Sequence, residues 1–206
     1  MTDWSRFQVE RISTPTYLKR NLIHLDLLLS ALRRGRDSVL EVGVGSGAQS
    51  SILSHVATLV VSIDNDSRIL GAARPNLQRF GPGVQLVAAD AFAMPFASGS
   101  FGVCVSQGLM EHFEDRRIGA LLNEQLRVAR SVVFSVPSDR YPRQDVGDER
   151  LLSPAEWDTI VREAVDPDRY RVQARYYRFD PESVKYSALA GRRLGGFSVL
   201  VTVDPR

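Results

Sequence analysis

Three glycines at alternate positions, Gly43, Gly45 and Gly47, follow a short apolar run at residues 39–42. Because glycine has no Cβ atom, the backbone there can take positive φ angles and a ligand can come close to the main chain. A helix that begins directly afterwards would offer unpaired N–H groups at its first turn. The spacing therefore predicts a buried strand that turns into a helix, with a nucleotide-like ligand across the end of the strand. The alternative interpretation is a glycine-rich turn that binds nothing.

Two aspartates end the next two predicted strands. Asp64 comes about twenty residues after the glycine loop, where a carboxylate can accept hydrogen bonds from both hydroxyls of a ribose. Asp90 could accept a hydrogen bond from an adenine amino group, while Ala91 and Phe92 sandwich the ring. The structural alternatives are a helix N-cap for Asp64 and a turn residue for Asp90.

His112 is the best candidate for a general base, because an imidazole can take up a proton near neutral pH. A structural role that fixes its loop is the alternative. His24 and His55 are expected to be structural. Cys104, the single cysteine, lies in a predicted strand and is expected to be an inert core thiol. Because no His or Cys cluster has the spacing of metal ligands, we expect no metal.

The composition suits one domain with a proper core, since the chain has 206 residues and 44% hydrophobic content. Its 26 basic and 24 acidic side chains nearly balance, and no Lys/Arg block indicates a nucleic-acid partner. No stretch is long and apolar enough to span a bilayer, and residues 1–6 do not resemble a signal peptide. The single cysteine fits a reducing compartment. We therefore expect a soluble cytoplasmic protein and leave its oligomeric state open.

Apolar periodicity predicts strands that alternate with helices along most of the chain, which implies a parallel sheet with helices on both faces. The last two strands have no long crossover helix between them, so we expect them to pair antiparallel. The predicted strands are 38–42, 58–63, 84–89, 101–106, 132–136, 170–179 and 197–203. The predicted helices are 16–32, 48–55, 67–77, 116–129 and 153–165, with a helical turn at 181–189.

A nicotinamide enzyme must be considered, because residues 43–48 formally fit G-x-G-x-x-A and Asp64 fits the acid that binds the ribose. The glycine pattern alone does not discriminate. A long predicted helix precedes the motif, and the chain is short for a separate substrate domain. An NAD-dependent oxidoreductase is therefore kept as the alternative.

Several segments together resemble the class I S-adenosylmethionine-dependent methyltransferases, specifically the small type 11 group. The matching segments are 39–47, 61–66, 84–96, 100–112 and 150–165, and residues 109–113 (Leu-Met-Glu-His-Phe) resemble the family's Leu-x-Glu-His segment. The resemblance implies a Rossmann-like, doubly wound α/β fold with seven strands in the order 3-2-1-4-5-7-6 and the last strand antiparallel. It implies one domain over residues 1–206, in which an N-terminal helical segment (1–35) covers the active site of the core (36–206).

The resemblance also implies S-adenosylmethionine as the cofactor and a set of residues that bind it. Glu41 would organise the site around the methionine amino group, and Gln107 and Gly108 would line the cofactor beneath its methyl group. The full set of implied cofactor-binding residues is Glu41, Gly43, Gly45, Gly47, Asp64, Asn65, Asp90, Ala91, Phe92, Gln107 and Gly108.

Substrate residues in this family come from the N-terminal segment and from the loops after the fourth and fifth strands. We accordingly predict substrate contacts from Trp4, Tyr17, Met110, Tyr141 and Arg150. Because little is added to the core, the expected acceptor is a small molecule that is methylated on an O, N or C atom. A non-catalytic module that binds S-adenosylmethionine is a further alternative.

Overall fold

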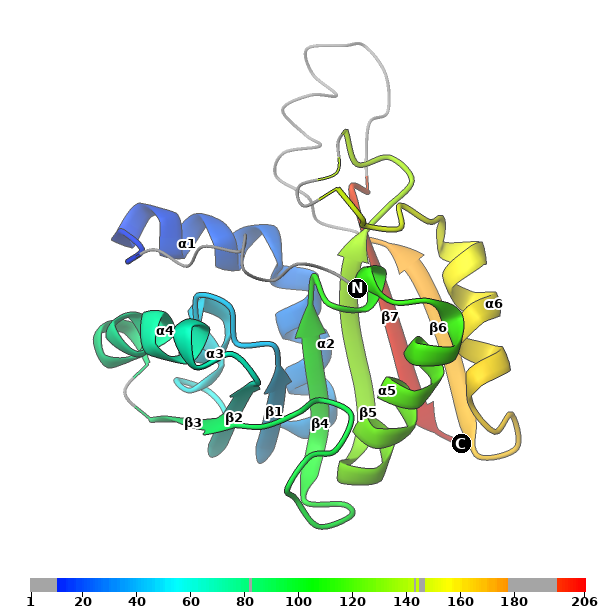
Figure 1. Ribbon diagram of the computed structural model, residues 1–206, viewed down its shortest axis with the longest axis horizontal. Coiled ribbons are helices and arrows are strands. Elements are labelled where there is room, and N and C mark those ends of the chain that lie inside the picture. Colours follow the sequence, from blue (N-terminus) through cyan, green and yellow to red (C-terminus); the bar gives the residue numbers. More distant parts are fainter. Residues whose placement is uncertain (1–10, 82, 143, 145–146, 178–195) are drawn as a thin grey trace.

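The computed structural model describes residues 11–81, 83–142, 144, 147–177 and 196–206. Its strands form one mixed sheet in the order β3-β2-β1-β4-β5-β7-β6, which confirms the predicted fold (Figure 1). Neighbouring strands pair parallel from β3 to β5, whereas β7 is antiparallel to both β5 and β6. The strands are β1 (Ser38–Val42), β2 (Leu59–Asp64), β3 (Val84–Ala88), β4 (Phe101–Gln107), β5 (Ala129–Pro137), β6 (Tyr170–Tyr176) and β7 (Ser198–Pro205).

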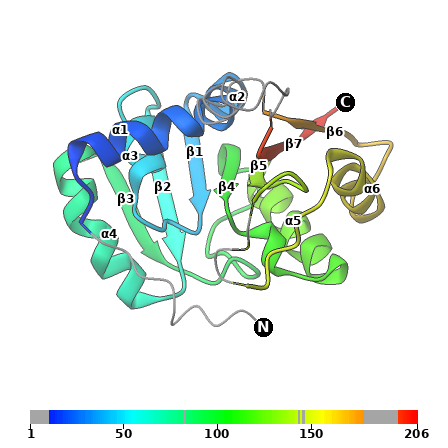
Figure 2. The same ribbon diagram turned by 90° about the horizontal axis from the view of Figure 1, so that it is seen from above.

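Helices cover both faces of this sheet. Figure 2 shows α1, α2 and α3 on one side and α5 and α6 on the other. The helices are α1 (Thr14–Ile23), α2 (Leu25–Gly35), α3 (Ala48–Leu53), α4 (Ser67–Phe80), the short 3₁₀ helix η2 (Met110–His112), α5 (Asp115–Val128) and α6 (Pro154–Ala164). Among the described residues, none of these helices is long and apolar enough to cross a membrane.

The core is divided by the sheet, because successive side chains of a strand point to opposite faces. Val39 packs with Leu27 and Leu28 of α2 on one face. Leu40 belongs to the larger cluster on the other face, which includes Trp157 of α6. The apolar runs of the central strands are thus buried on both sides, as in parallel sheets generally.

The N-terminal helical segment differs from the prediction of one helix over residues 16–32. His24 has φ −99° and ψ 22°, so the helix breaks there into α1 and α2. The apolar stripe continues through the break in the sequence, but the two helices bury different faces. Leu18 and Leu22 of α1 remain about half exposed, whereas Leu27 and Leu28 of α2 are buried against the sheet.

Smaller differences concern the ends of elements. Helix α4 continues through Pro75 to Phe80 instead of ending at residue 77. The predicted helical turn at 181–189 and the end of the predicted strand 170–179 lie outside the described residues.

Candidate functional site

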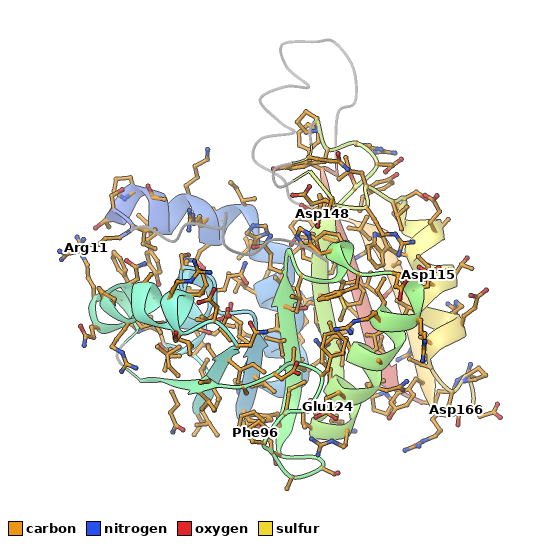
Figure 3. The ribbon with its side chains drawn as sticks, in the orientation of Figure 1. Arg11, Phe96, Asp115, Glu124, Asp148 and Asp166 are labelled. Atoms are coloured by element: carbon orange, nitrogen blue, oxygen red, sulfur yellow. The ribbon has the colours of Figure 1, made fainter. Side chains whose placement is uncertain are left out.

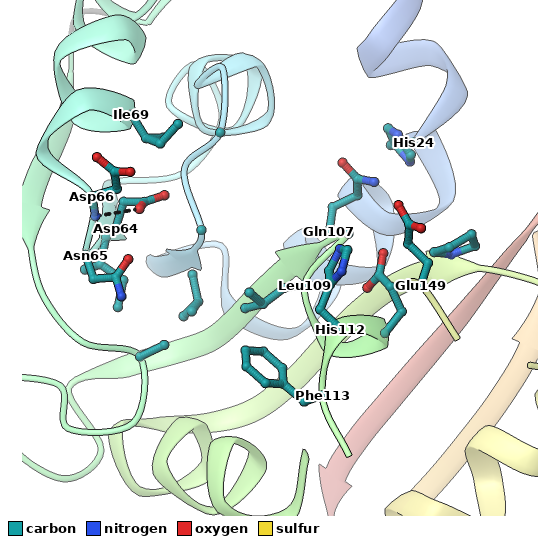
Figure 4. Close-up of a pocket in the computed structure, with 18 of the residues that line it drawn as sticks. His24, Asp64, Asn65, Asp66, Ile69, Gln107, Leu109, His112, Phe113 and Glu149 are labelled. Carbon is teal, nitrogen blue, oxygen red and sulfur yellow. Dashed lines mark hydrogen bonds between the residues drawn. The ribbon is translucent and has the colours of Figure 1, made fainter. Parts of the chain in front are cut away.

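A cavity of about 1070 Å³ lies at the carboxyl ends of the parallel strands. It spans the point between β1 and β4 at which the order of the strands reverses, where open α/β sheets bind their ligands. Figure 4 shows two groups of side chains that face this cavity from opposite sides. Asp64, Asn65 and Ile69 lie on one side, and His112 and Glu149 lie on the other.

The glycine loop forms part of the cavity wall through two of its three glycines. Gly43 and Gly45 line the cavity with φ angles of +82° and +49°. A Cβ atom added at Gly45 would meet no protein atom within 4 Å. Gly47 does not line the cavity; its φ is +75°, and an added Cβ would come within 2.9 Å of Leu77. Gly47 therefore permits close packing of α3 against α4.

Glu41 lies behind the loop rather than in the cavity wall. Its carboxylate accepts hydrogen bonds from the hydroxyls of Ser50 in α3 and Ser62 in β2, the latter over 3.0 Å. Burial raises the pKa of Glu41 to about 7, against the lowering effect of the two hydroxyls. This arrangement ties β1, β2 and α3 together beneath the glycine loop.

Asp64 lines the cavity and is not the N-cap of the following helix, which was the structural alternative for it. Asp66 is the N-cap of α4, and its side chain accepts a hydrogen bond of 2.8 Å from the backbone N–H of Arg68. Asp64 Oδ1 accepts a hydrogen bond of 3.0 Å from the backbone N–H of Asp66. Burial raises the pKa of Asp64 from its ordinary value. Asn65 lines the cavity beside it.

Asp90, Ala91 and Phe92 line the same side of the cavity. Asp90 Oδ1 accepts a hydrogen bond of 2.9 Å from the backbone N–H of Phe92, which holds the turn after β3. The ring of Phe92 meets Phe113 edge-on, with 5.4 Å between the centroids. The Arg117 guanidinium lies 4.1 Å from the Phe92 ring centroid. Phe92 and Phe113 thus give this part of the cavity lining apolar surfaces against which a flat ring could pack.

Gln107 and Gly108 stand at the end of β4, in the middle of the cavity wall. Gly108 has φ +66°, and its N–H donates to the carbonyl of Ser135 in β5 over 2.9 Å. Gln107 is exposed to the cavity, with Gln49 Nε2 at 3.5 Å from its Oε1.

His112 lines the cavity, and its side chain is only 4% exposed. Its Nδ1 lies 2.8 Å from Asp148 Oδ1, a contact that orients the ring. Figure 3 shows Asp148 at the end of the sheet where the cavity lies, far from Phe96 and Glu124 at the opposite end. An imidazole fixed through one nitrogen can present the other to a ligand.

Glu111 is the most deeply buried acid of the cavity wall, at 2% exposure. Burial raises its pKa to about 8, and the negative charges of Glu149 and Asp148 add to this rise. Glu149 is 6% exposed and accepts a hydrogen bond of 2.9 Å from the N–H of Gly147.

Of the predicted substrate residues, the structure brings Tyr141 into the cavity wall. Tyr17 stacks on Phe80 at 4.3 Å away from the cavity, and Met110 is fully buried in the core. Arg150 instead binds the start of α5, with Nη1 at 2.6 Å from Asp115 Oδ1. The structure does not support substrate contacts for these three residues. Trp4 lies outside the described residues.

His24 and Glu149 are among the cavity residues that were missed or misjudged from the sequence. His24 was expected to be purely structural, yet it lines the cavity, with its Nδ1 3.2 Å from the hydroxyl of Tyr177. Glu149 received no role, although it belongs to the polar segment after β5 that was expected to meet the substrate. An acid in that segment was the only signal that could have indicated it.

The described residues contain no group of three or more His, Cys, Asp or Glu side chains that could hold a metal ion. Cys104 is fully buried, and burial raises the pKa of its thiol. It has the environment of a core residue rather than of a reactive thiol.

Comparisons with known proteins agree with this geometry. A family described as "Methyltransferase domain" matches residues 39–131. Protein-L-isoaspartate O-methyltransferase 2 of Marinobacter nauticus is 32% identical over 108 residues, and the protein-L-isoaspartate O-methyltransferase of Methanoculleus marisnigri is 37% identical over 82 residues. These matches cover 52% and 39% of this chain, but only 47% and 34% of the relatives.

Solved structures show a similar fold over nearly the whole chain. A protein from Pyrococcus horikoshii is 16% identical, with a TM-score of 0.71 and 98% of each chain covered. A structure titled as a SAM-dependent methyltransferase from Aquifex aeolicus is 17% identical, with a TM-score of 0.64 over 93% of this chain and 98% of that one. At these identities the likeness concerns the fold alone.

Proposed function

We propose that this chain is a class I S-adenosylmethionine-dependent methyltransferase, which transfers a methyl group from S-adenosylmethionine to an O, N or C atom of a small-molecule acceptor. The observation that carries the proposal is the convergence of three ligand-binding features on one cavity: the glycine loop after β1, Asp64 after β2 and the Asp90–Phe92 turn after β3. In a parallel sheet these three strand ends meet at the same edge, where nucleotides bind.

The residues of this cavity fit the proposed cofactor. Open space beside Gly45 leaves room for the methionine portion or the ribose next to the main chain. The carboxylate of Asp64 would accept hydrogen bonds from the two ribose hydroxyls. Asp90 and the apolar surface of Phe92 would hold the adenine, with Gly108 and Gln107 beneath the reacting methyl group. Glu41 would position the loop through Ser50 and Ser62 without touching the reacting atoms.

When bound, S-adenosylmethionine supplies a methyl group that its sulfonium has already activated. The protein then has to align the acceptor atom, exclude water and, where the acceptor arrives protonated, remove a proton. Phe113 and Leu109 lie between the two sides of the cavity in Figure 4 and would exclude water from the line of transfer. His112, oriented by Asp148, is the candidate base; the alternative, which we favour, is that it only fixes the loop around η2.

The acceptor would enter from the other side of the cavity. Helix α1 and its junction with α2 contribute Lys19, Ile23 and His24 to this wall, which supports the proposal that the N-terminal segment 1–35 covers the active site. Tyr141 and Glu149 add the loop after β5. The whole cavity, at about 1070 Å³, is slightly larger than the range of about 300–1,000 Å³ for single small-molecule sites, so a cofactor and a small acceptor would fill it together.

The relatives named as isoaspartate methyltransferases suggest a second acceptor class, an isoaspartyl side chain of a protein. The match covers about half of those relatives or less, so their substrate is not assigned to this chain. An isoaspartyl peptide therefore belongs in the test panel.

Calorimetry with S-adenosylmethionine, S-adenosylhomocysteine and NAD tests the cofactor. Binding of NAD alone would refute the proposal and favour an oxidoreductase. A metabolite panel that includes the isoaspartyl peptide, read by the mass gain of one methyl group, tests the activity. If the cofactor binds but no member of a broad panel is methylated, a non-catalytic binding module is favoured instead.

A further inference from the structure

The side of the cavity opposite Asp64 contains a buried carboxylate that the methyl transfer described above does not use. Seven buried side-chain atoms of the described residues have no hydrogen-bond partner, and Glu111 Oε2 is the one among them whose residue lines the cavity. A buried polar atom without a partner costs about 1–3 kcal/mol, more when it is charged. A ligand in the cavity that donates hydrogen bonds to Glu111 would remove this cost.

The buried ionisable groups around Glu111 are predominantly acidic. Glu149 is 6% exposed, lines the same wall and acts on Glu111 electrostatically. Asp148 adds a negative charge from behind His112. The lysine and arginine side chains of the cavity lining are Lys19 on α1 and Arg117 on α5, and both are exposed. Low dielectric strengthens the effect of buried charges, so the buried acids outweigh these two exposed cations beside Glu111.

His24, His112, Tyr141 and the exposed Glu114 also belong to the cavity lining. His112 is engaged with Asp148, and His24 with Tyr177. Each imidazole is held by a partner, and Glu149 and Asp148 are the groups whose charges act on Glu111.

From this arrangement we propose that the acceptor carries a basic nitrogen, protonated in solution, which docks against Glu111 with Glu149 as the second acidic contact. The inference rests on the proposed function, because it names the substrate class of the same cavity. An ammonium group has three N–H donors and can satisfy both carboxylates, whereas a hydroxyl has one and a carboxylate would be repelled. The raised pKa of Glu111 is consistent with a carboxyl group that stays neutral until a cation arrives.

Matched ligands of one carbon skeleton test the charge requirement directly. We would titrate the full chain, loaded with S-adenosylhomocysteine, with 2-phenylethylamine, 2-phenylethanol and phenylacetate, and repeat the series with hexylamine, hexanol and hexanoate. The amines should bind about tenfold to a hundredfold more tightly than the alcohols, the range for a hydrogen bond to a charged group. The carboxylates should bind least.

Single substitutions test whether Glu111 causes the preference for amines. Glu111→Gln keeps the size and removes the charge, so it should lose most of the amine preference, and Glu149→Gln should lose part of it. Glu163→Gln, an exposed position on α6, is the matched control and should keep it. Amine binding should also tighten from pH 6.5 to 9, as Glu111 ionises while the amine stays protonated.

Three outcomes would overturn the proposal: equal or tighter binding of the alcohols or carboxylates, an unchanged amine preference in Glu111→Gln, or no amine binding at 10 mM. Repeating the titrations without S-adenosylhomocysteine distinguishes failure of the amine proposal from failure of the proposed methyltransferase function. A protein that ignores the cofactor but prefers amines would refute the methyltransferase proposal alone.

Discussion

Replacing Glu111 by glutamine should change how the stability of the protein depends on pH. The pKa of Glu111 is raised from 4.5 to about 8, first by burial and then by the charges of Glu149 and Asp148. A carboxyl group whose pKa is higher in the folded state keeps its proton there after the unfolded chain has lost it. Its contribution to stability is therefore full below pH 4.5 and is lost as the pH rises towards 8.

The magnitude follows from the size of the shift. One pKa unit corresponds to about 1.36 kcal/mol, so this group can cost the folded state on the order of 5 kcal/mol by pH 8 as an upper bound. Most of that loss falls between pH 5 and 8. Glutamine stays neutral throughout, so Glu111→Gln should resemble the wild type at pH 5 and be clearly more stable at pH 8.5.

Urea unfolding at half-unit pH intervals from 5 to 8.5 measures the effect, with Glu163→Gln as a control at an exposed position. Glu41 and Asp64 also have raised pKa values, but both are present in every variant, so the difference from wild type isolates Glu111. Parallel stability curves for the wild type and Glu111→Gln would refute the reasoning, because they would mean that Glu111 is ionised in the folded protein at no cost.

Four further substitutions test the cofactor side, the candidate base and the packing of the glycine loop. Asp64→Ala should weaken binding of S-adenosylmethionine in calorimetry by about 1.5–3 kcal/mol with little loss of stability; unchanged binding with a lower Tm would make Asp64 a structural residue. If His112 is a base, His112→Asn should lower kcat by about 10²–10⁴-fold along an imidazole titration; we expect the structural alternative, in which KM rises for both substrates and stability falls. Gly47→Ala should destabilise the fold by about 1–3 kcal/mol in urea unfolding, because its φ is +75° and Leu77 occupies the space of a Cβ; Gly45→Ala, which meets no such neighbour, should cost less.

The sheet could be predicted from the sequence because its signals are local. Each central strand is a short apolar run, and the glycine loop, Asp64 and Asp90 directly follow such runs. Residues at the ends of parallel strands are brought together by the topology itself. Once the order of the strands was expected, the position of these residues on one cavity followed.

The break between α1 and α2 could not be predicted in this way. The leucines continue with helical spacing through His24, and a period of 3.6 residues does not record which face a neighbour covers. Packing against two different surfaces decides the break: α2 lies on the sheet, whereas α1 contacts α3. For the same reason, Tyr17 was predicted to contact the substrate, whereas its ring stacks on Phe80.

The acceptor side of the cavity was hard to predict because its residues are distant in sequence. His24 comes from a helix junction, Glu111 from a 3₁₀ turn, and Glu149 from an irregular loop. None of these segments has a repeating pattern that fixes where a side chain points. Met110 and Glu111 are adjacent, yet one is buried in the core and the other lines the cavity.

This distribution also limits what family resemblance can say about the acceptor. The family match over residues 39–131 includes every cavity residue proposed to hold the cofactor. On the acceptor side it includes Glu111 and His112 but stops before Tyr141 and Glu149, and His24 precedes it. Relatives that share only the matched region can therefore bind the same cofactor through the same strand ends and still act on different acceptors. For this chain, the acceptor has to be inferred from the charge and burial of its own residues. Substitution of Glu111 is the most direct test of that inference.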